Sequence, residues 1–479
     1  MISKKHEKYL FPSLKDARKR LKKETEQIRY TLPAHLIGIG NNKKYLIKTY
    51  GCQGNLADSE KMGGILETLG YCKVIDESEA DIIILNTCAI RENAENRIFG
   101  ELGRIKMLKR YNPDLLIALC GCMPQEENVV NKVMEKYPQV DIVLGTHNFY
   151  LLGEYIYEAY LSKEKVVQVY SKEGEIVEGL PIKRAFSQKA WVNIMYGCDE
   201  FCSYCIVPYT RGKERSRHYH DIIQEVQELA CNGYKEVTLL GQNVNAYGKD
   251  FTDLNYTFAD LLFDLNKTDI SRIRFTTSHP RDLDIQTIKT MALRGNIMPH
   301  LHLPVQSGSN KILKRMNRKY TKEKYIELIK KLRYYIPDIS LTTDIIVGFP
   351  GETDEDFAAT LDLVNQVNFE GAFTFIFSPR SGTPASKYED NIDYAIKKQR
   401  LYSLNKLVNE GYLNGNKRFE GMIVKVLVDG YSDKNKNMLS GYTEHNKLVN
   451  FAGNENIIGQ IVDVKIEKAH TWHLRGIIE

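Results

Sequence analysis

Three cysteines lie close together near the middle of the chain with the spacing C-x3-C-x2-C: Cys198, Cys202 and Cys205. Three thiolates can hold three irons of a [4Fe–4S] cluster, whereas electron-transfer clusters take a fourth cysteine. No fourth cysteine lies close by in the sequence, so one iron would be open to a small molecule. An open position is the mark of a catalytic metal site, whereas structural zinc, the alternative, usually takes four protein ligands. The spacing therefore favours a catalytic iron–sulfur cluster.

A second set of three cysteines follows from the predicted topology of the first 160 residues. Apolar runs at 45–49, 81–86, 115–119 and 140–144 alternate with helical patterns at 58–69, 92–111 and 126–137. Such alternation predicts a parallel sheet covered by helices on both faces. Cys52, Cys88 and Cys122 each follow one of the first three strands. The loops at the carboxyl ends of parallel strands line one crevice, so we expect these three thiols to converge there.

Cys120 competes with Cys122 for the third place in this set. Cys120 closes an apolar run, where a buried thiol is the commonest state of a cysteine. Cys122 lies in the turn that follows, so we favour Cys122. Cys72 and Cys231 lie at a strand start and a helix end, and we expect structural roles for both.

The central part of the chain predicts a partial barrel. Six strands are predicted there, and helical patterns alternate with them. The strands lie at 190–195, 236–240, 272–277, 300–303, 341–347 and 372–377. Connections between parallel strands are right-handed, so such a series curls; eight units close a barrel and six leave it open on one side. The C-x3-C-x2-C loop follows the first of these strands. Polar residues such as Gly241 and Gln242 follow the second strand, at the end where barrel sites form.

The two ends of the chain differ from the middle. Short alternating strands at 421–430, 458–466 and 474–478 predict a small OB-like barrel, a frequent nucleic-acid module. The first 30 residues are basic and predict a helix around 16–29, either a solvated surface segment or an RNA-contacting arm. We therefore divide the chain into a basic extension (1–42), an N-terminal domain (43–161), a core (184–414) and a C-terminal domain (415–479). The expected fold class is α/β.

The composition bears on the binding partners of the protein and on the compartment in which it works. There are 66 Lys and Arg residues against 61 Asp and Glu, a net charge of +5 that is compatible with nucleic acid without arguing for it. Nine cysteines without a signal peptide indicate a reducing, cytoplasmic setting and metal ligation rather than disulfides. No apolar run reaches 18 residues, so we expect no membrane span.

With these residues in view, the chain resembles the methylthiotransferase branch of the radical S-adenosylmethionine (SAM) enzymes. The resemblance rests on the run from Cys198 to Gly212 and on the residues around Cys52, Cys88 and Cys122, and it covers residues 43–479. Further motifs are most similar to family members that modify isopentenyladenosine in tRNA; they lie at 145–148, 241–248 and 316–320. The order of parts is also that of the family: a cluster domain, a radical SAM barrel and a TRAM domain.

The resemblance implies two [4Fe–4S] clusters and SAM as radical source and methyl donor. Cys198, Cys202 and Cys205 would hold the cluster that cleaves SAM to a 5′-deoxyadenosyl radical. Cys52, Cys88 and Cys122 would hold an auxiliary cluster that carries the transferred sulfur, which a second SAM methylates. Tyr204 is expected to pack on the SAM adenine, and Gly241 with Gln242 to approach its amino group, unless they only shape a turn.

The implied reaction adds a methylthio group to C2 of N6-isopentenyladenosine at position 37 of tRNA. The implied partners are the tRNA anticodon stem-loop and an electron donor such as flavodoxin or ferredoxin, with the enzyme a monomer. Two alternatives remain open from the residues. A sister enzyme would modify threonylcarbamoyladenosine in tRNA or an aspartate of a ribosomal protein. A non-catalytic RNA-binding protein with Fe–S or zinc sites is the alternative from another class, and the two open cysteine sets speak against it.

Overall fold

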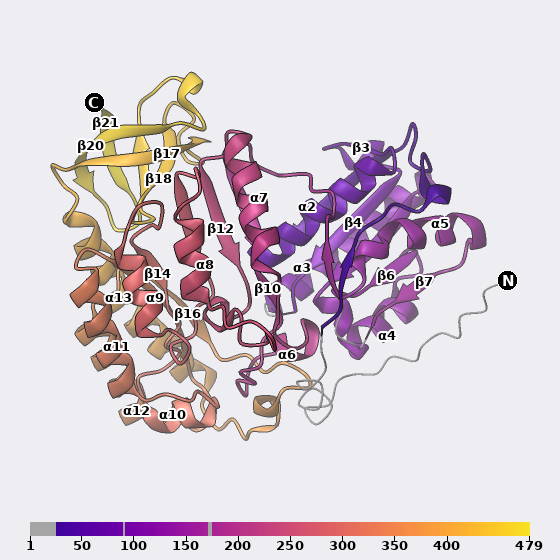
Figure 1. Ribbon diagram of the computed structural model, residues 1–479. Helices are drawn as coiled ribbons and strands as arrows, with labels where there is room; N and C mark the ends of the chain where they lie inside the picture. The colour runs from indigo at the N-terminus through magenta and orange to yellow at the C-terminus, as the bar shows by residue number, and fades with distance from the viewer. Residues whose placement is uncertain (1–24, 90–91, 171–174) are drawn as a thin grey trace.

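The computed structural model has three modules, with the N-terminal one beside the core and the C-terminal one over the upper end of the core (Figure 1). The N-terminal module is α/β, the core is barrel-like and the C-terminal module is a β-barrel. The structure describes residues 25–89, 92–170 and 175–479. The order of modules and the α/β class agree with the sequence prediction.

The N-terminal module is built on a six-stranded parallel sheet with the order β3-β2-β4-β5-β6-β7. Two apolar clusters cover its two faces, one from helices α2 and α5 and the other from α3 and α4. The four strands expected from the sequence are present, and the short strand β3 begins at Cys72, where the sequence indicates a strand start; the short edge strand β7 was not predicted. The strands are β2 (Lys44–Tyr50), β3 (Cys72–Lys73), β4 (Ile82–Thr87), β5 (Leu116–Gly121), β6 (Ile142–Leu144) and β7 (Val166–Gln168), and the helices are α2 (Gln53–Thr68), α3 (Glu92–Tyr111), α4 (Glu127–Lys136) and α5 (Leu152–Ser162).

The core has six main parallel strands in two ladders, β9-β12-β13 and β14-β15-β16. A single parallel bridge between Ile273 and Ile297 connects the two ladders. The apolar cluster beneath them is formed by the inner faces of the helices and the strands. The strands are β9 (Lys189–Asn193), β12 (Glu236–Leu240), β13 (Arg272–Phe275), β14 (His300–His302), β15 (Ser340–Val347) and β16 (Ala372–Ile376), with a small hairpin of β10 (Met195–Tyr196) and β11 (Arg215–Ser216).

Helices alternate with these strands as the sequence predicts. They are α6 (Val207–Thr210), α7 (Tyr219–Cys231), α8 (Phe258–Leu265), α9 (Ile285–Ala292), α10 (Asn310–Arg315), α11 (Lys322–Tyr335), α12 (Asp354–Val367) and α13 (Tyr394–Lys417). The last of them, α13, was not predicted; it packs against β16 and β15 and leads into the C-terminal module.

The C-terminal module is a closed five-stranded barrel with the order β17-β18-β19-β21-β20. Its strands are β17 (Ile423–Tyr431), β18 (Leu439–Thr443), β19 (Leu448–Phe451), β20 (Ile461–Ala469) and β21 (Leu474–Ile478). Two buried arginines of β13 dock it on the core. Arg272 donates to the carbonyls of Tyr442 and Lys425 at 2.8 and 2.9 Å, and Arg274 donates to the carbonyl of Thr443 at 2.7 Å.

The basic N-terminal segment differs from the expected helix over 16–29. Gln27–Arg29 is instead strand β1, which pairs in parallel with β8 (Ile176–Glu178). Each residue of β1 pairs with a residue 149 positions further along the chain, so local periodicity does not reveal the partner strand. Positions 16–24 of the expected helix lie outside the described residues. Within the described ranges, no helix combines the length and apolar character needed to span a membrane.

Candidate active site

The three N-terminal cysteines lie in adjacent loops at one edge of the sheet. Cys52 precedes α2, Cys88 follows β4 and Cys122 follows β5. Backbone hydrogen bonds stack these loops: the Cys88 N–H donates to the Tyr50 carbonyl at 3.0 Å, and the Cys122 N–H donates to the Thr87 carbonyl at 2.8 Å. A hydrogen bond with Cys88 and the nearby Arg211 charge lower the pKa of the Cys52 thiol to about 5, against the opposing effect of burial. The expected convergence is therefore present in the structure.

Two buried asparagines hold the first two loops together. The Asn55 Nδ2 donates to Asn86 Oδ1 and to the Thr87 carbonyl, both at 3.1 Å, and Asn86 Nδ2 donates to the Asn55 carbonyl at 2.8 Å. Gly121, at φ +101°, lets the third loop approach, because a Cβ there would lie 2.3 Å from the Thr87 carbonyl oxygen. Sequence reasoning missed the role of these asparagines, although each lies within three residues of a cysteine.

Cys120 has the structural environment expected for it. Its side chain is fully buried in the core of the sheet, and its Sγ lies 3.6 Å from the Met62 Sδ. Burial raises the pKa of this thiol well above its usual value. The structure thus groups Cys122, and not Cys120, with the other two thiols; which cysteines bind iron stays a prediction.

Arg211, from the core, reaches into this N-terminal set. Its Nε donates to the Cys122 Sγ at 3.1 Å, and its Nη1 lies 2.7 Å from Asp58 Oδ2 in α2. Arg211, Cys122 and Asp58 are all buried. Burial raises the pKa of Cys122, and the Arg211 charge opposes this rise.

The second cysteine set lies in the loop after β10, where a glycine and a glutamine fix its start. Gly197 has φ +77°, and a Cβ there would lie 1.9 Å from the Lys213 carbonyl oxygen. Its N–H donates to Gln242 Oε1 at 2.6 Å, and the Cys198 N–H donates to the Gly212 carbonyl at 3.1 Å. The cysteine loop is therefore anchored to the loop that follows β12.

The segment after α10 holds the other side of this loop. The Ser203 N–H donates to the Met316 carbonyl at 2.9 Å, and Asn317 Nδ2 donates to the Phe201 carbonyl at 2.8 Å. The buried Arg318 places its Nη1 3.5 Å from the Cys202 Sγ. The sequence marks this segment only by its family likeness, and no local signal in it indicates a contact with the cysteine loop.

The three thiols of the loop repel one another as thiolates. Burial, with the charge on Cys202, raises the pKa of Cys205 to about 12. Burial, with Glu214, Cys202 and Cys205 nearby, also raises the pKa of Cys198 well above its usual value. A bound cationic metal reverses this effect, because a coordinating thiol is deprotonated outright. The donor set thus fits an iron–sulfur cluster, and so does the N-terminal set of three thiols.

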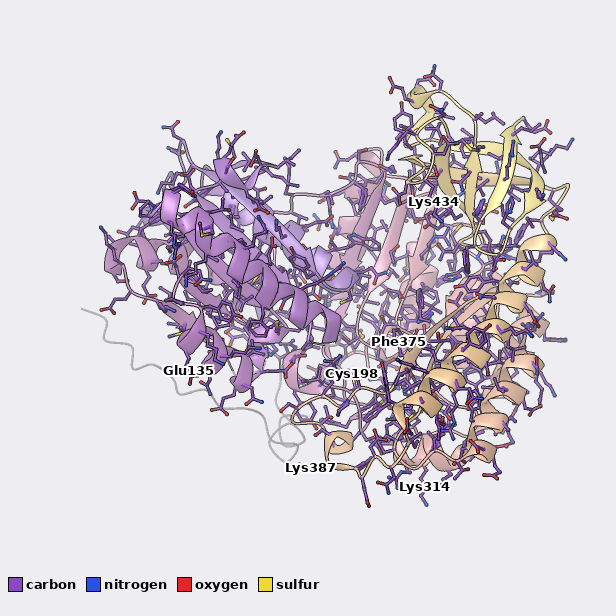
Figure 2. The ribbon with its side chains drawn as sticks, turned by 180° about the vertical axis from the view of Figure 1, so that it is seen from behind. Glu135, Cys198, Lys314, Phe375, Lys387 and Lys434 are labelled. Carbon is purple, nitrogen blue, oxygen red and sulfur yellow. The ribbon has the colours of Figure 1, made fainter. Side chains whose placement is uncertain are left out.

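The two sets face one another across a thin apolar layer. Cys122 packs in one cluster with Ala89 and Ile206, and Ile206 directly follows Cys205. Thr146 Oγ1 donates to the Thr210 carbonyl at 2.5 Å and joins the two modules beside this layer. Cys198 lies where the N-terminal module meets the core (Figure 2). Both expected three-cysteine sets therefore belong to one interface.

The residues expected to bind SAM lie around the second set. Tyr204 packs beside Phe349 of the turn after β15, with ring centroids 6.4 Å apart. At Gly241 a Cβ would lie 2.7 Å from the Met195 Cγ, so a larger residue there would force the Met195 side chain to move. Gln242 uses its Oε1 on Gly197. Their contacts with SAM stay a prediction.

Comparisons with known proteins agree with this geometry. Family models match in three places: "Uncharacterized protein family UPF0004" at 44–145, "Radical SAM superfamily" at 192–364 and "TRAM domain" at 417–478. A "tRNA-2-methylthio-N(6)-dimethylallyladenosine synthase" of Geobacillus thermodenitrificans is 57% identical over 480 residues, covering 99% of this chain and 92% of that protein. One of Bacillus cytotoxicus, with the same name, is 59% identical over 469 residues, covering 98% and 92%. This chain belongs to that family. It is a radical SAM methylthiotransferase that uses SAM and [4Fe–4S] clusters.

Solved structures show the same fold in more distant proteins. The radical SAM methyltransferase TsrM from Kitasatospora setae, with cobalamin and a [4Fe–4S] cluster bound, aligns with a TM-score of 0.53 and 13% identity, over 72% of this chain and 77% of that one. Its complex with tryptophan and a SAM analogue aligns with a TM-score of 0.51 and 12% identity, over 69% and 72%. At this identity the likeness concerns the fold alone.

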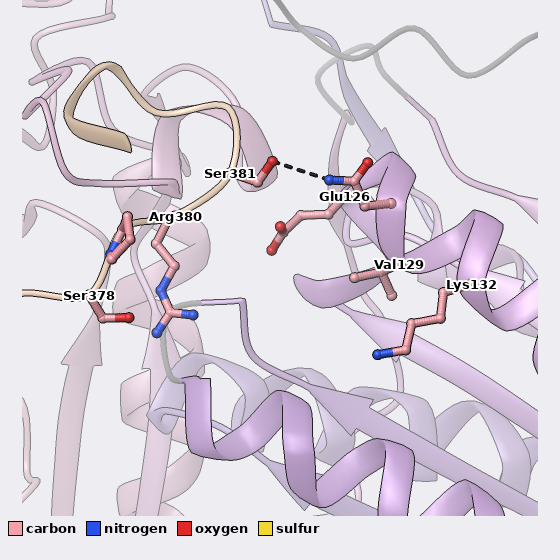
Figure 3. Close-up of a pocket in the computed structure, with 8 residues that line it drawn as sticks. Glu126, Val129, Lys132, Ser378, Arg380 and Ser381 are labelled. Atoms are coloured by element: carbon pink, nitrogen blue, oxygen red, sulfur yellow. Dashed lines mark hydrogen bonds between the residues drawn. The ribbon is translucent and has the colours of Figure 1, made fainter. Parts of the chain in front are cut away.

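A pocket opens between the N-terminal module and the core of this methylthiotransferase. Its volume is about 310 Å³, and it lies between α4 and the loop that follows β16. Lys132 and Glu126 line one side, and Arg380 lines the other (Figure 3). Asn128 Nδ2 donates to Ser381 Oγ at 3.2 Å across the pocket edge. In the chain, α4 begins five residues after Cys122.

Proposed function

We propose that this enzyme adds a methylthio group to C2 of N6-isopentenyladenosine at position 37 of tRNA. The observation that carries the proposal is the meeting of two three-cysteine sets at one interface, with Cys122 packed on the residue after Cys205. A reaction that joins a radical centre to a sulfur donor needs both within reach of one substrate atom. The names of relatives 57–59% identical supply the modified nucleoside.

The two cysteine sets have separate tasks in this proposal. Cys198, Cys202 and Cys205 hold the cluster that binds SAM, and Cys52, Cys88 and Cys122 hold the auxiliary cluster. When bound, these groups supply a 5′-deoxyadenosyl radical and the sulfur that is transferred. The protein positions both sets and keeps water away from them. Gln242 and Arg318 hold the loop of Cys198, Cys202 and Cys205. Asn55 and Asn86 hold the loops of Cys52 and Cys88, and the apolar layer between the sets excludes water.

The open side of the core offers a place for the RNA base. Phe373 and Phe375 on β16 are 59% and 47% exposed. Thr374 between them donates to Asn405 of α13 at 2.5 Å, so the two rings point to the opposite face, where Phe373 meets His302 of β14 edge-on. Aromatic faces stack on unpaired bases. We assign these two rings to the target adenine and its isopentenyl group.

The pocket at the end of the same strand suits the RNA backbone. Arg380 and Lys132 supply two positive charges against the one carboxylate of Glu126, and Ser378, Ser381 and Asn128 supply hydrogen-bonding groups. Such residues make the common contacts to phosphate. In this arrangement the phosphates of the anticodon loop lie over the pocket while the base enters toward Phe375.

The remaining parts of the proposal concern the setting of the enzyme. We assign it to the cytoplasm as a monomer, with the domain division 1–42, 43–161, 184–414 and 415–479. Its electron donor is a flavodoxin or ferredoxin, because SAM cleavage requires an electron at a low potential.

The decisive test is mass spectrometry of tRNA nucleosides from a host without methylthiotransferases, with and without this gene. The 2-methylthio form of isopentenyladenosine is the expected new product. If methylthio-threonylcarbamoyladenosine appeared instead, the sister activity would replace the proposal. Alanine at Cys52, Cys88 and Cys122 should abolish the product and spare deoxyadenosine formation, whereas alanine at Cys198, Cys202 and Cys205 should abolish both.

A further inference from the structure

Arg211 belongs to the core yet has its side chain in the N-terminal cysteine site. It is 6% exposed and follows α6, in the same loop as the SAM-cluster cysteines. Two of its three nitrogens have fixed partners, since Nε donates to Cys122 Sγ at 3.1 Å and Nη1 pairs with Asp58 at 2.7 Å. The ion pair and the thiol together fix the plane of the guanidinium.

The third nitrogen, Nη2, is buried and has no hydrogen-bond partner among the described residues. A buried donor without an acceptor costs free energy, more so when it is charged. Such a group calls for an acceptor that belongs to the working enzyme.

The surroundings of Nη2 show where that acceptor belongs. Gly54, in the first turn of α2, leaves space beside the thiols. A Cβ on it would lie 3.5 Å from Cys52 Sγ, 3.9 Å from Arg211 Nη2 and 4.0 Å from Gln242 Nε2. One thiol and two N–H donors therefore surround a single small space, which glycine keeps free of a side chain.

We propose that Arg211 is the positioning residue for the sulfur group held at the auxiliary site, to which its Nη2 donates a hydrogen bond. The inference rests on the proposed assignment of Cys52, Cys88 and Cys122 to that cluster. The ligand class is an anionic sulfur species, sulfide or methanethiolate. Asp58 and Cys122 keep the guanidinium aimed at it, and Gln242 Nε2 lies at the same space.

A purely structural role would need only the ion pair between Arg211 and Asp58. The proposed role also requires the forked geometry of the guanidinium, because a lysine offers one point charge and cannot serve three partners in fixed directions. Hydrogen bonds to cluster sulfurs also tune the reduction potential. Replacement of Arg211 should therefore change both the affinity for an added sulfur anion and the potential of the auxiliary cluster.

The experiment uses full-length protein with Cys198, Cys202 and Cys205 changed to alanine, reconstituted with iron and sulfide so that only the auxiliary cluster remains. Methanethiolate is titrated into this protein and into its Arg211→Lys and Arg211→Met forms, with the EPR spectrum and reduction potential of the cluster as readouts. Arg475→Lys, on the exposed face of the C-terminal barrel, is the matched control. Asp58→Asn tests the ion pair separately, because it keeps all donors of Arg211.

Both Arg211 variants should bind methanethiolate at least tenfold more weakly. Their potentials should move in the negative direction by about 59 mV, the equivalent of a tenfold change for one electron. Arg475→Lys should match the parent, and Asp58→Asn should keep most of the affinity. If Arg211→Met does not fold, the affinity and the potential measured for Arg211→Lys are enough to test the inference.

Unchanged affinity, spectrum and potential in Arg211→Lys, with the cluster bound, would overturn this inference and leave the proposed function intact. A parent protein that binds no iron through its N-terminal cysteines would instead overturn the cluster assignment itself, and the inference with it.

Discussion

The N–H of Gly197 and the side-chain oxygen of Gln242 lie 2.6 Å apart, and this hydrogen bond joins the ends of two neighbouring core strands. Gly197 directly precedes Cys198, and Gln242 follows β12, the strand that pairs with β9. The second strand of the core therefore positions Cys198, the first cysteine of the C-x3-C-x2-C loop.

Gln242→Ala should disturb this loop. The Gly197 N–H would lose its acceptor in a partly buried place, at a cost of about 1–3 kcal/mol in the free energy of unfolding. We expect deoxyadenosine formation from SAM, measured with dithionite as reductant, to fall at least tenfold. Gln224→Ala, on the exposed face of α7, is the control and should leave the rate unchanged. Equal rates in the two variants would refute a positioning role for Gln242.

The two neighbouring cysteines of the third N-terminal loop should respond differently to alanine. Cys122→Ala should leave the protein with about half of its iron and no methylthiolation, because one ligand of the auxiliary cluster is lost. Cys120→Ala should keep full iron content, since its sulfur packs on Met62 in the core of the sheet. It should instead lower the free energy of unfolding by about 1 kcal/mol, as expected for a small cavity. Iron analysis and chemical denaturation measure these two quantities in both variants. Loss of iron in Cys120→Ala but not in Cys122→Ala would assign the ligand to Cys120.

Arg380→Ala should weaken binding of the anticodon stem-loop. Each phosphate contact that is lost lowers the salt dependence of binding, and the slope of log K against log [salt] should fall by about one. Fluorescence anisotropy with a labelled stem-loop at several salt concentrations measures this. Lys314→Ala, on α10 and not among the residues that line the pocket, serves as the control and should keep the parent slope. Identical slopes in both variants would place the RNA elsewhere.

Acid should loosen the contact between the core and the C-terminal barrel. Burial, with Arg274, His302, Lys447 and His445 nearby, holds the pKa of His300 well below its usual value. The unfolded chain then binds more protons below pH 6.5, so stability falls as the pH drops through that value. At pH 5.5 the loss from His300 should reach about 1.4 kcal/mol.

Thermal unfolding at pH 7.5 and 5.5 checks this dependence. His300→Gln should reduce the pH-dependent fall of the midpoint, because it removes the group that titrates. His35→Gln, at an exposed site paired with Glu154, is the control and should keep the parent dependence. An unchanged dependence in His300→Gln would contradict the assignment to His300.

The parts of this molecule that the sequence predicts are those with a local signal. The C-x3-C-x2-C spacing is contiguous, and buried parallel strands such as β4 and β5 are continuous apolar runs. Cys52, Cys88 and Cys122 could be placed together because strand ends share an edge. The edge strand β7 was missed because three residues carry no period, and α13 was missed because its apolar residues follow no marked stripe.

The contacts that join modules have no local signal. Arg211 pairs with Asp58 across the boundary between two modules, and Arg272 bonds to carbonyls far along the chain. Nothing in the residues next to Arg211 indicates that its partners lie in the first sheet. Such pairs are set by the docking of complete modules, which only the three-dimensional structure reveals.

The position of Arg211 in the chain also sets an order of events during synthesis. The ribosome completes the three N-terminal cysteines before it reaches Arg211, which follows Cys122 by 89 residues. A nascent chain that has released only its first sheet thus presents these thiols without the cation that belongs among them. We expect iron delivered at that stage to meet an unfinished binding site, so that maturation of the proposed auxiliary cluster waits until the core has been translated and has docked.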